Sequence, residues 1–380
     1  MPRIRIKRIT LVALGCLLPL LLVGAVGCGA RAAMGWSSPI LEDGILYSGS
    51  KTGQIYALDV ETRERIWAFP SEGVLAGIYS SPVITDESLF FGSYEIEVSS
   101  FLIFQNQKIE GKAYALDLAN GQERWHFPTG GSEDSEPFLG TPALGDGLAY
   151  FTSSNGKLYA LDVETGSRRW EFETGDEIWG GPAWSDGTVY VGSADKNLYA
   201  LDATTGAQKW SFNAGGAIYC TPWVDEELIY FGSLDNNVYA MRADDGEQVW
   251  TYATGNWVWA TPVRVEDTLY VASLDHSLYA LDAANGQLRW QAQAEDMITS
   301  PPAIADGKAF FSAHGDGVYA VNADNGAELW HYPSEGVLVV LSSPVVADGS
   351  VYVNADDGNL YVLDAETGNL RWEVAPGGTQ

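Results

Sequence analysis

The chain has 380 residues, of which 46% are hydrophobic and 19% charged, and it contains 14 Trp, 19 Tyr and 13 Phe. This apolar content supplies a packed core and excludes a largely disordered chain. Acidic residues outnumber basic ones by 50 to 21, and the net charge of −29 would repel a phosphate backbone, which excludes nucleic-acid binding. Glycine is abundant at 42 residues and methionine rare at 4, a balance that favours short strands and tight turns.

The N-terminus has the pattern of an export signal. Four basic residues among the first eight precede an uncharged, mainly apolar run over residues 9–27. The run ends in Ala25-Val26-Gly27-Cys28, which resembles a bacterial lipobox and implies lipidation of Cys28. Two alternatives remain open, namely ordinary secretion with cleavage at Ala30-Arg31-Ala32 and an uncleaved anchor, since the run nearly reaches membrane-spanning length.

We therefore expect a signal peptide over residues 1–27, a short tether over 28–35 and a folded domain over 36–380. The protein is predicted to be exported and held at a membrane as a lipoprotein facing the periplasm or the cell exterior, with soluble secretion as the alternative. Removal of residues 1–27 takes away four basic residues and no acidic one, so the net charge becomes −33. The mature domain is strongly acidic.

One repeat of about 40 residues occurs eight times in the folded domain. Each copy holds a Pro, then a Tyr-Ala-Leu-Asp-like tetrad, then a Trp, and the three markers give the same count. The prolines stand at 39, 82, 142, 182, 222, 262, 302 and 344. The tryptophans are Trp67, Trp125, Trp170, Trp210, Trp250, Trp290, Trp330 and Trp372.

Each repeat predicts four short strands, here called A to D. In the copy over residues 180–212, strand A surrounds Pro182, and the later strands are TVYVGS, LYALD and QKWSF. Asp, Asn and Gly occupy the intervening turns, where their backbone preferences explain them without a ligand. A calcium site at Asp356-Asp357-Gly358 is not favoured, because no 12-residue loop with a closing Glu is present.

A four-stranded unit of this size needs neighbours to cover both faces of its sheet, so eight units predict an all-β, eight-bladed β-propeller of four-stranded antiparallel blades. The recurring Trp of strand D is expected to anchor each blade on the next one by burying its ring and donating its indole N–H. Whether residues 29–35 add a closing strand is left open by the sequence.

The second repeat carries an insertion. Gly92 to Tyr114 spans 22 positions where Gly192 to Tyr199 spans 7, which predicts an extended β-hairpin with Phe101 and Phe104 near its tip. The following D–A loop, from Trp125 to Pro142, spans 17 positions where 12 are usual and contains Glu133-Asp134-Ser135-Glu136. We expect both features on one face of the ring. Exposed apolar residues there would contact a partner or a membrane, and the alternative is that the hairpin folds onto the propeller.

Aromatic residues also recur three positions before the Pro, at the start of the innermost strand. Five of the eight repeats carry one there, and Trp257 lies nearby. The rings are expected to crowd the mouth of the channel as a binding surface, or to fill space between blades. These candidates are Trp36, Tyr79, Trp179, Tyr219, Trp257 and Trp259.

The remaining reactive side chains indicate no catalytic centre. Cys220 takes a place where other repeats have Ser, Gly or Ala, so we interpret it as a small buried residue. His126 and His331 follow a strand D Trp, and His276 and His314 lie in B–C turns. No hydrolase triad, zinc spacing or phosphate-binding loop is visible, and we assign no catalytic or metal-binding residue.

The pattern Leu-Tyr-Ala-Leu-Asp-Ala-x-Thr-Gly-x-x-x-Trp at 198–210 resembles the tryptophan-docking repeat of PQQ-type propellers, and the resemblance covers all eight repeats. That family includes quinoprotein alcohol dehydrogenases, which bind pyrroloquinoline quinone and Ca²⁺, and non-enzymatic BamB-like lipoproteins of outer-membrane assembly. Such dehydrogenases have long insertions and an adjacent Cys pair, whereas this sequence has mostly minimal loops and no adjacent Cys pair. The fold alone does not choose between these functions.

The sequence therefore predicts a monomeric, non-enzymatic scaffold without a cofactor that contacts protein partners through its loop-bearing face, as in BamB-like assembly of outer-membrane proteins. The alternatives are a sensor or binding protein for a peptide or carbohydrate and, less favoured, a quinone-dependent dehydrogenase.

Overall fold

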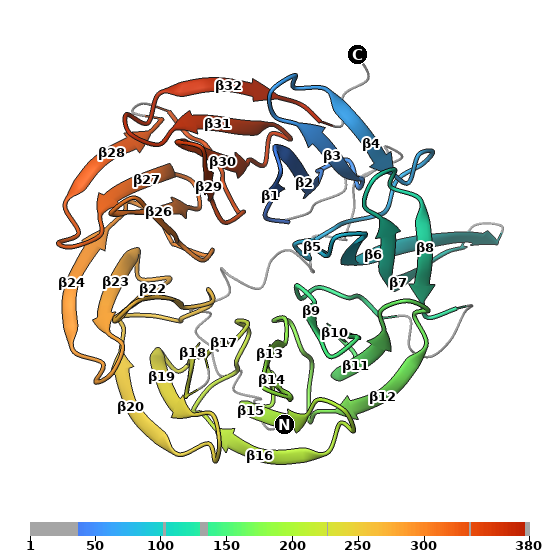
Figure 1. Cartoon of the computed structure of the whole chain (residues 1–380), viewed down its shortest axis with the longest axis horizontal. Helices are drawn as coiled ribbons and strands as arrows, with labels where there is room; N and C mark the ends of the chain where they lie inside the picture. The colour runs from blue at the N-terminus through green and yellow to red at the C-terminus, as the bar shows by residue number, and fades with distance from the viewer. Residues whose placement is uncertain (1–36, 102–103, 130–135, 226, 334–335, 377–380) are drawn as a thin grey trace, which may run out of the picture. The chain divides into compact units, whose positions relative to one another are not determined.

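Short strands and tight turns form eight four-stranded antiparallel sheets in the computed structural model, which describes residues 37–376 except 102–103, 130–135, 226 and 334–335. For residues 95–101 and 104–109 it describes the backbone alone. The sheets follow one another around a ring, with the first strand of each sheet innermost and the fourth outermost (Figure 1). The eight-bladed propeller is confirmed, and each blade is one contiguous segment.

The strands of the first four blades are β1 Ile40–Glu42, β2 Ile45–Gly49, β3 Ile55–Asp59 and β4 Arg65–Phe69; β5 Val83–Ile84, β6 Ser88–Phe101, β7 Phe104–Asp117 and β8 Glu123–Phe127; β9 Ala143–Gly145, β10 Leu148–Thr152, β11 Lys157–Asp162 and β12 Arg168–Glu173; β13 Ala183–Ser185, β14 Thr188–Gly192, β15 Asn197–Asp202 and β16 Gln208–Asn213.

The strands of the last four blades are β17 Trp223–Val224, β18 Leu228–Gly232, β19 Asn237–Arg242 and β20 Gln248–Ala253; β21 Val263–Val265, β22 Thr268–Ala272, β23 Ser277–Asp282 and β24 Leu288–Gln293; β25 Ala303–Ala305, β26 Lys308–Ala313, β27 Gly317–Asn322 and β28 Glu328–Tyr332; β29 Val345–Ala347, β30 Ser350–Asn354, β31 Leu360–Asp364 and β32 Leu370–Val374.

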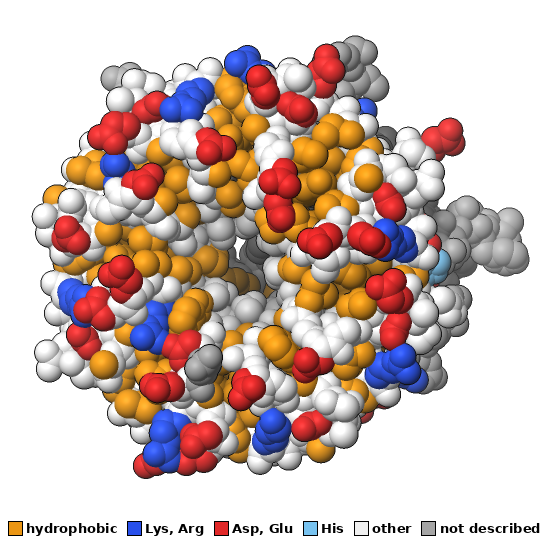
Figure 2. Space-filling view, viewed as in Figure 1, with side chains coloured by type: hydrophobic (Ala, Val, Ile, Leu, Met, Phe, Trp, Pro, Cys, Tyr) orange, Lys and Arg blue, Asp and Glu red, His pale blue; other side chains and the backbone are white. Residues whose placement is uncertain are grey.

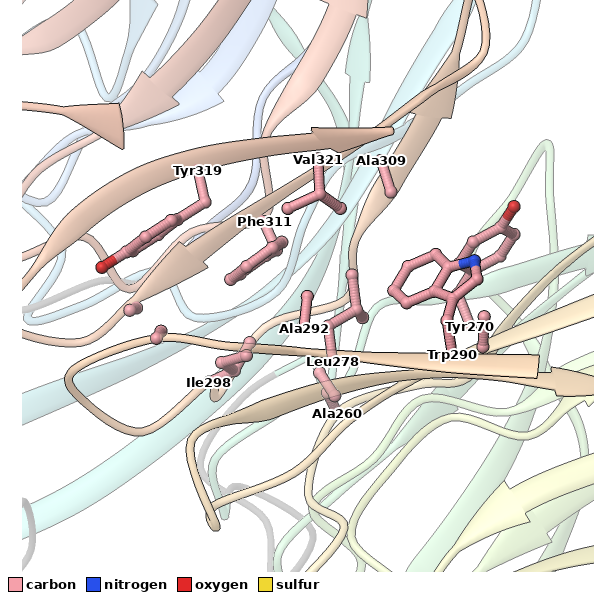
Figure 3. Packing of buried hydrophobic residues seen from close by; sticks show 14 residues of the cluster. Ala260, Tyr270, Leu278, Trp290, Ala292, Ile298, Ala309, Phe311, Tyr319 and Val321 are labelled. Atoms are coloured by element: carbon pink, nitrogen blue, oxygen red, sulfur yellow. The ribbon is translucent and has the colours of Figure 1, made fainter. Parts of the chain in front are cut away.

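The hydrophobic core lies between blades rather than within one blade. Between blades 6 and 7, side chains of both sheets point toward one another, including Leu278, Phe311 and Val321 (Figure 3). Trp290 of β24 packs beside Tyr270, with ring centroids 5.8 Å apart. Because each sheet is covered only by its neighbours, no blade has a complete core of its own.

Tryptophan docking joins consecutive blades. Seven of the eight strand D tryptophans donate the indole N–H to a backbone carbonyl of the next blade at 2.8–3.2 Å. Each of these rings also lies on a C–D turn glycine of that next blade, whose φ is between 68° and 74°. A Cβ at this glycine would stand only 2.5–2.7 Å from the indole, so the close approach requires glycine. These glycines are Gly121, Gly166, Gly206, Gly246, Gly286, Gly326 and Gly368.

The seam between blades 8 and 1 is built differently. In the C–D turn of blade 1, Arg63 with φ 62° takes the place of the glycine, and its guanidinium lies 5.4 Å from the centroid of the Trp372 ring. At this seam a cation–π contact therefore takes the place of the contact between tryptophan ring and glycine. The Ser343 N–H donates to Ser38 Oγ at 2.9 Å, and Asn354 Nδ2 donates to the Ser37 carbonyl at 2.9 Å. Among the strands that the structure describes, none is exchanged between blades 8 and 1, and residues 29–35 lie outside the described residues.

Cys220 lies in the core between blades 4 and 5 and is 2% exposed. The Gly232 N–H donates to its sulfur at 3.2 Å, and burial raises the pKa of the thiol to about 12. A thiol that stays protonated in an apolar environment is a poor nucleophile.

We predict that Gly206→Ala lowers the free energy of unfolding more than Gly187→Ala does. Both glycines have positive φ, but nothing lies within 4 Å of a Cβ at Gly187, whereas a Cβ at Gly206 would be 2.7 Å from the Trp170 ring. The control loses about 1–2 kcal/mol from backbone strain. The Gly206 variant loses about 1–3 kcal/mol more because its ring contact is overpacked. Guanidinium unfolding monitored by circular dichroism measures both, and equal losses would contradict the docking account.

We also predict that Cys220 resists iodoacetamide while the protein is folded. At pH 9 its alkylation should be slower than in the guanidinium-unfolded chain by roughly 100-fold or more, because the raised pKa keeps the thiol protonated. Mass spectrometry of the peptide that contains Cys220 gives both rates. Similar rates in the two states would show that the thiol is accessible and ionised.

Candidate binding surface on the loop face

The strand directions give the ring two different faces. A–B and C–D turns lie on one face, here called the turn face, and B–C turns and D–A loops lie on the other, here called the loop face. Minimal turns occupy the turn face in all blades, as with Asp186-Gly187 between β13 and β14. The loop face carries the connections that differ most among repeats, so it is the first place to look for a site.

The long hairpin of strands β6 and β7 stands out on the loop face. The two strands pair continuously from Ser88 opposite Asp117 to Phe101 opposite Phe104. Figure 1 shows them running past β8 at the edge of the ring. The predicted extended hairpin is therefore present, with Phe101 and Phe104 paired beside residues 102–103 at its tip.

Both neighbouring D–A loops hold the base of the long hairpin. On one side, Gly77 and Tyr94 form an antiparallel bridge, and the Tyr79 ring stacks on Tyr94 with centroids 5.4 Å apart. On the other side, Gly92 approaches Phe138 so closely that a Cβ would be 2.5 Å from its carbonyl oxygen. The long D–A loop and the insertion thus meet in space. Residues 133–135 of its acidic segment lie outside the described residues.

Three of the predicted aromatic residues form one cluster. Trp179, Tyr219 and Trp259, here called the aromatic cluster, come from the equivalent position of blades 4, 5 and 6. Their ring centroids are 5.5 Å (Trp179–Tyr219), 5.1 Å (Tyr219–Trp259) and 6.1 Å (Trp179–Trp259) apart. Trp179 of blade 4 and Trp259 of blade 6 contact each other although blade 5 lies between them, because this repeat position is close to the central axis of the ring. All three rings are half-buried, so part of the cluster faces solvent.

Acidic groups border the aromatic cluster. The Trp179 indole N–H donates to Glu177 Oε2 at 2.7 Å, which orients that ring. Burial raises the pKa of Tyr219, and the charges of Glu177 and Asp176 raise it further. A half-exposed aromatic surface beside carboxylates can bind apolar groups by burial, flat groups by stacking and cations by cation–π attraction.

The other predicted aromatic residues do not join this cluster. Tyr79 stacks on the long hairpin, as described above. Trp257 is half-buried, and its carbonyl accepts the Leu274 N–H at 2.9 Å, which fixes its loop to the next B–C turn. Trp36 lies outside the described residues. For Phe101 and Phe104 only the backbone is described, so their contacts are not part of the site.

The aspartates of the B–C turns are used by the fold. Asp235 accepts the Tyr239 hydroxyl at 2.6 Å and the Gly215 N–H at 2.7 Å, which ties the turn to a D–A loop. Equivalent pairs of contacts occur at Asp195 and Asp275. Each of these carboxylates is therefore oriented by two hydrogen bonds within the blade framework.

The histidines have local partners. His126 Nδ1 lies 2.7 Å from Glu123 Oε1, and the His331 ring stacks on Tyr319 with centroids 4.2 Å apart. His314 Nδ1 lies 3.8 Å from Asp296 Oδ2, and His276 occupies a turn position with φ 72°. None of these contacts forms a nucleophile and base arrangement.

The described part of the chain contains no cluster of metal-ligating side chains: there, no group of three or more His, Cys, Asp or Glu side chains could hold a metal ion. Near the axis, the aromatic cluster fills space with its own ring contacts.

The face of the ring shown in Figure 2 carries acidic side chains all around it. On the face shown in Figure 2, acidic side chains alternate with basic and hydrophobic ones around a central opening, without one large patch of either sign. Within the described residues, no helix is long and apolar enough to cross a membrane.

Two of the contacts that the structure shows were not predicted from the sequence. The seam contact of Arg63 with Trp372 could have been found in the sequence, since the first repeat alone has Arg where the other repeats have Gly before strand D. The contact between Trp179 and Trp259 has no such signal, because 80 positions separate the residues and only the ring geometry brings them together.

Comparison with known proteins agrees with this fold. The chain is similar to the crystal structure of BamB from Moraxella catarrhalis, with 20% sequence identity and a TM-score of 0.60 over 73% of this chain and 87% of that chain. It is also similar to the computationally designed Ika8 protein (15% identity, TM-score 0.71, 87% and 98% covered) and to the quinohemoprotein alcohol dehydrogenase from Comamonas testosteroni (16%, 0.65, 92% and 75%). At these identities the likeness shows the fold alone.

The family comparison is more specific. No curated protein matches the sequence significantly. A family profile described as outer membrane protein assembly factor BamB matches residues 24–178, 154–258 and 253–380, which together include every blade. The chain therefore belongs to this family of PQQ-type repeat propellers.

Proposed function

We propose that this protein is a cell-envelope scaffold that binds protein partners through its loop face and serves the assembly of outer-membrane proteins. The observation that carries the proposal is the long hairpin, whose strands are 14 residues each and continue beyond the length of the repeat, and which is held at its base by both neighbouring loops. A paired backbone that projects from a rigid ring offers both strand edges and side chains to a partner. The BamB family profile supports the cellular process.

Export and anchoring are part of the same proposal. The signal peptide over residues 1–27 would direct the chain out of the cytoplasm, and a lipid on Cys28 would hold the mature protein at a membrane through the tether over 28–35. The propeller over 36–380 would then act as a monomer. The basic and apolar segments of the sequence and the family profile support this arrangement.

A second candidate function rests on the aromatic cluster. Three half-buried rings from three blades give a surface of the kind that binds a peptide or a carbohydrate. This candidate differs from the first one because it does not need the long hairpin.

We predict that the chain loses its partner when the long hairpin is shortened. Residues 93–112 are replaced by the blade 4 turn, residues 193–197, which restores a standard blade. Capture of partners from an envelope extract, measured by quantitative mass spectrometry, should fall by at least about tenfold, a loss of roughly 1.4 kcal/mol or more. In the control, the blade 4 turn residues 194–196 are exchanged for blade 5 residues 234–236. If both proteins capture the same partners equally, the hairpin is not the contact.

We predict for the second candidate that Trp259→Ala weakens binding of a stacking ligand without changing partner capture. Titration of a panel of oligosaccharides and short peptides is followed by fluorine NMR of 5-fluorotryptophan. A ligand of the cluster should shift the Trp259 resonance and bind the variant roughly tenfold more weakly. Leu139→Ala, at the same repeat position in blade 3, is the control. Unchanged affinities in Trp259→Ala would eliminate this candidate.

A further inference from the structure

A second surface lies on the turn face, between blades 1 and 2. A groove of about 750 Å³ opens there, lined by the A–B turns, the C–D turn of blade 2 and the outer strands. Its apolar lining includes Tyr47, Trp67 and Ile84, together with Ile66, which is 48% exposed. Its rim is acidic and consists of Glu42, Asp43, Asp86, Glu87 and Asp117. We call this site the acidic groove.

Part of the acidic charge in this groove has no cation beside it. Arg124 pairs with Asp117 at 3.2 Å and with Glu87 at 3.6 Å. In the described part of the chain, no ion pair includes Glu42, Asp43 or Asp86, and all three are exposed. Burial raises the pKa of Tyr47, and the charges of Glu42 and Asp43 add to the shift, so these two carboxylates act on the groove lining.

The equivalent place between blades 5 and 6 is occupied by an arginine of the protein itself. Arg264 stands two residues after the blade Pro, at the repeat position of Ile84. Its guanidinium forms an ion pair with Asp225 and lies 5.8 Å from the Trp223 ring centroid and 6.0 Å from that of Tyr230. An arginine in this position therefore combines charge pairing with stacking on aromatic rings.

Two of the three residues around that arginine have counterparts in the acidic groove, whereas Ile40 stands at the repeat position of Trp223. Asp225 stands three residues after its Pro, at the repeat position of Glu42, and Tyr230 stands at the position of Tyr47. The acid and the aromatic ring are thus both present between blades 1 and 2. Ile84 in place of arginine leaves them without the cation.

Blades 3 and 4 show a different way to fill the same place. Trp184 takes the position of Ile84 and lies against Gly145, where a Cβ would be 2.4 Å from the indole ring. Gly145 takes the position of Glu42, so the acid is absent where an aromatic ring covers the groove. The groove between blades 1 and 2 keeps the acid and lacks the large side chain.

We propose that the acidic groove binds an arginine side chain of a partner protein, in the place that Arg264 fills between blades 5 and 6. Arginine suits the site better than lysine because its planar guanidinium can stack on an aromatic ring and donate to two carboxylates at once. The apolar lining around Ile66 would receive the hydrophobic residues beside that arginine. This interaction goes beyond the proposed function, since it uses the opposite face of the ring and does not need the long hairpin.

The test uses a pair of peptides on the full-length chain in detergent. One probe is acetyl-Ser-Leu-Arg-Leu-Ser-amide, and its matched control carries citrulline, which is neutral and nearly isosteric, in place of arginine. The readout is the fluorine resonance of Trp67 in 5-fluorotryptophan protein, assigned with Trp67→Phe. The arginine peptide should shift this resonance saturably and bind at least tenfold more tightly than the citrulline peptide. No saturable shift, or equal binding of the two peptides, would overturn the proposal.

Two kinds of variants locate the site. Ile84→Arg supplies the missing arginine internally and should weaken peptide binding at least tenfold, while Ile304→Arg, at the same repeat position in blade 7, should leave it unchanged. Glu42→Gln with Asp43→Asn, on an exposed turn that tolerates polar replacements, should weaken binding severalfold and gives a second route if Ile84→Arg does not fold. Full affinity in Ile84→Arg that is folded by circular dichroism, or in the Glu42 and Asp43 double variant, contradicts the assignment. Hairpin-dependent partner capture is a separate measurement, so the two proposals fail independently.

Discussion

Docking of one tryptophan per blade on a glycine of the next blade is the interaction on which the ring depends. It joins the largest apolar side chain of the repeat to a backbone position that tolerates no Cβ, and an indole hydrogen bond fixes the orientation. Each docking contact links only neighbouring blades, so the ring is built up by repeating one blade-to-blade arrangement. The seam departs from this rule, since Arg63 rather than glycine faces Trp372, and a cation–π contact and seam hydrogen bonds complete the circle.

Residues that maintain the blade framework can be distinguished from residues that are available to bind a partner. Turn aspartates that could be mistaken for ligand groups accept hydrogen bonds from tyrosine hydroxyls and loop amides, as Asp235 does. Besides the seam, the described residues depart from the repeat at the long hairpin, the aromatic cluster and the acidic groove. Two of them lie on the loop face and one on the turn face, which allows a scaffold to engage more than one segment of its partners.

Much of the fold follows from the sequence, because its signals are local and repeated. The Pro, tetrad and Trp markers predict the blade count, and the insertion after Gly92 predicts the hairpin that the structure contains. The candidate binding surfaces could be predicted from the sequence less completely than the fold. The sequence suggests one aromatic rim, whereas the rings divide between the aromatic cluster and the Tyr79 stack on Tyr94. The acidic groove could not be recognised from the sequence alone. Ile84, Arg264 and Trp184 share one repeat position, but each faces a different residue of the neighbouring blade, and only the structure shows which one.

The central claim, that the long hairpin is where the scaffold meets a protein partner, is tested most directly by photocross-linking in intact cells. A benzoylphenylalanine at Phe101 is compared with one at Lys196, in the minimal B–C turn of blade 4. The account predicts discrete protein adducts from position 101 and none of the same mass from position 196. Identical adducts from both positions, or none from position 101 at full expression of the protein, would contradict it.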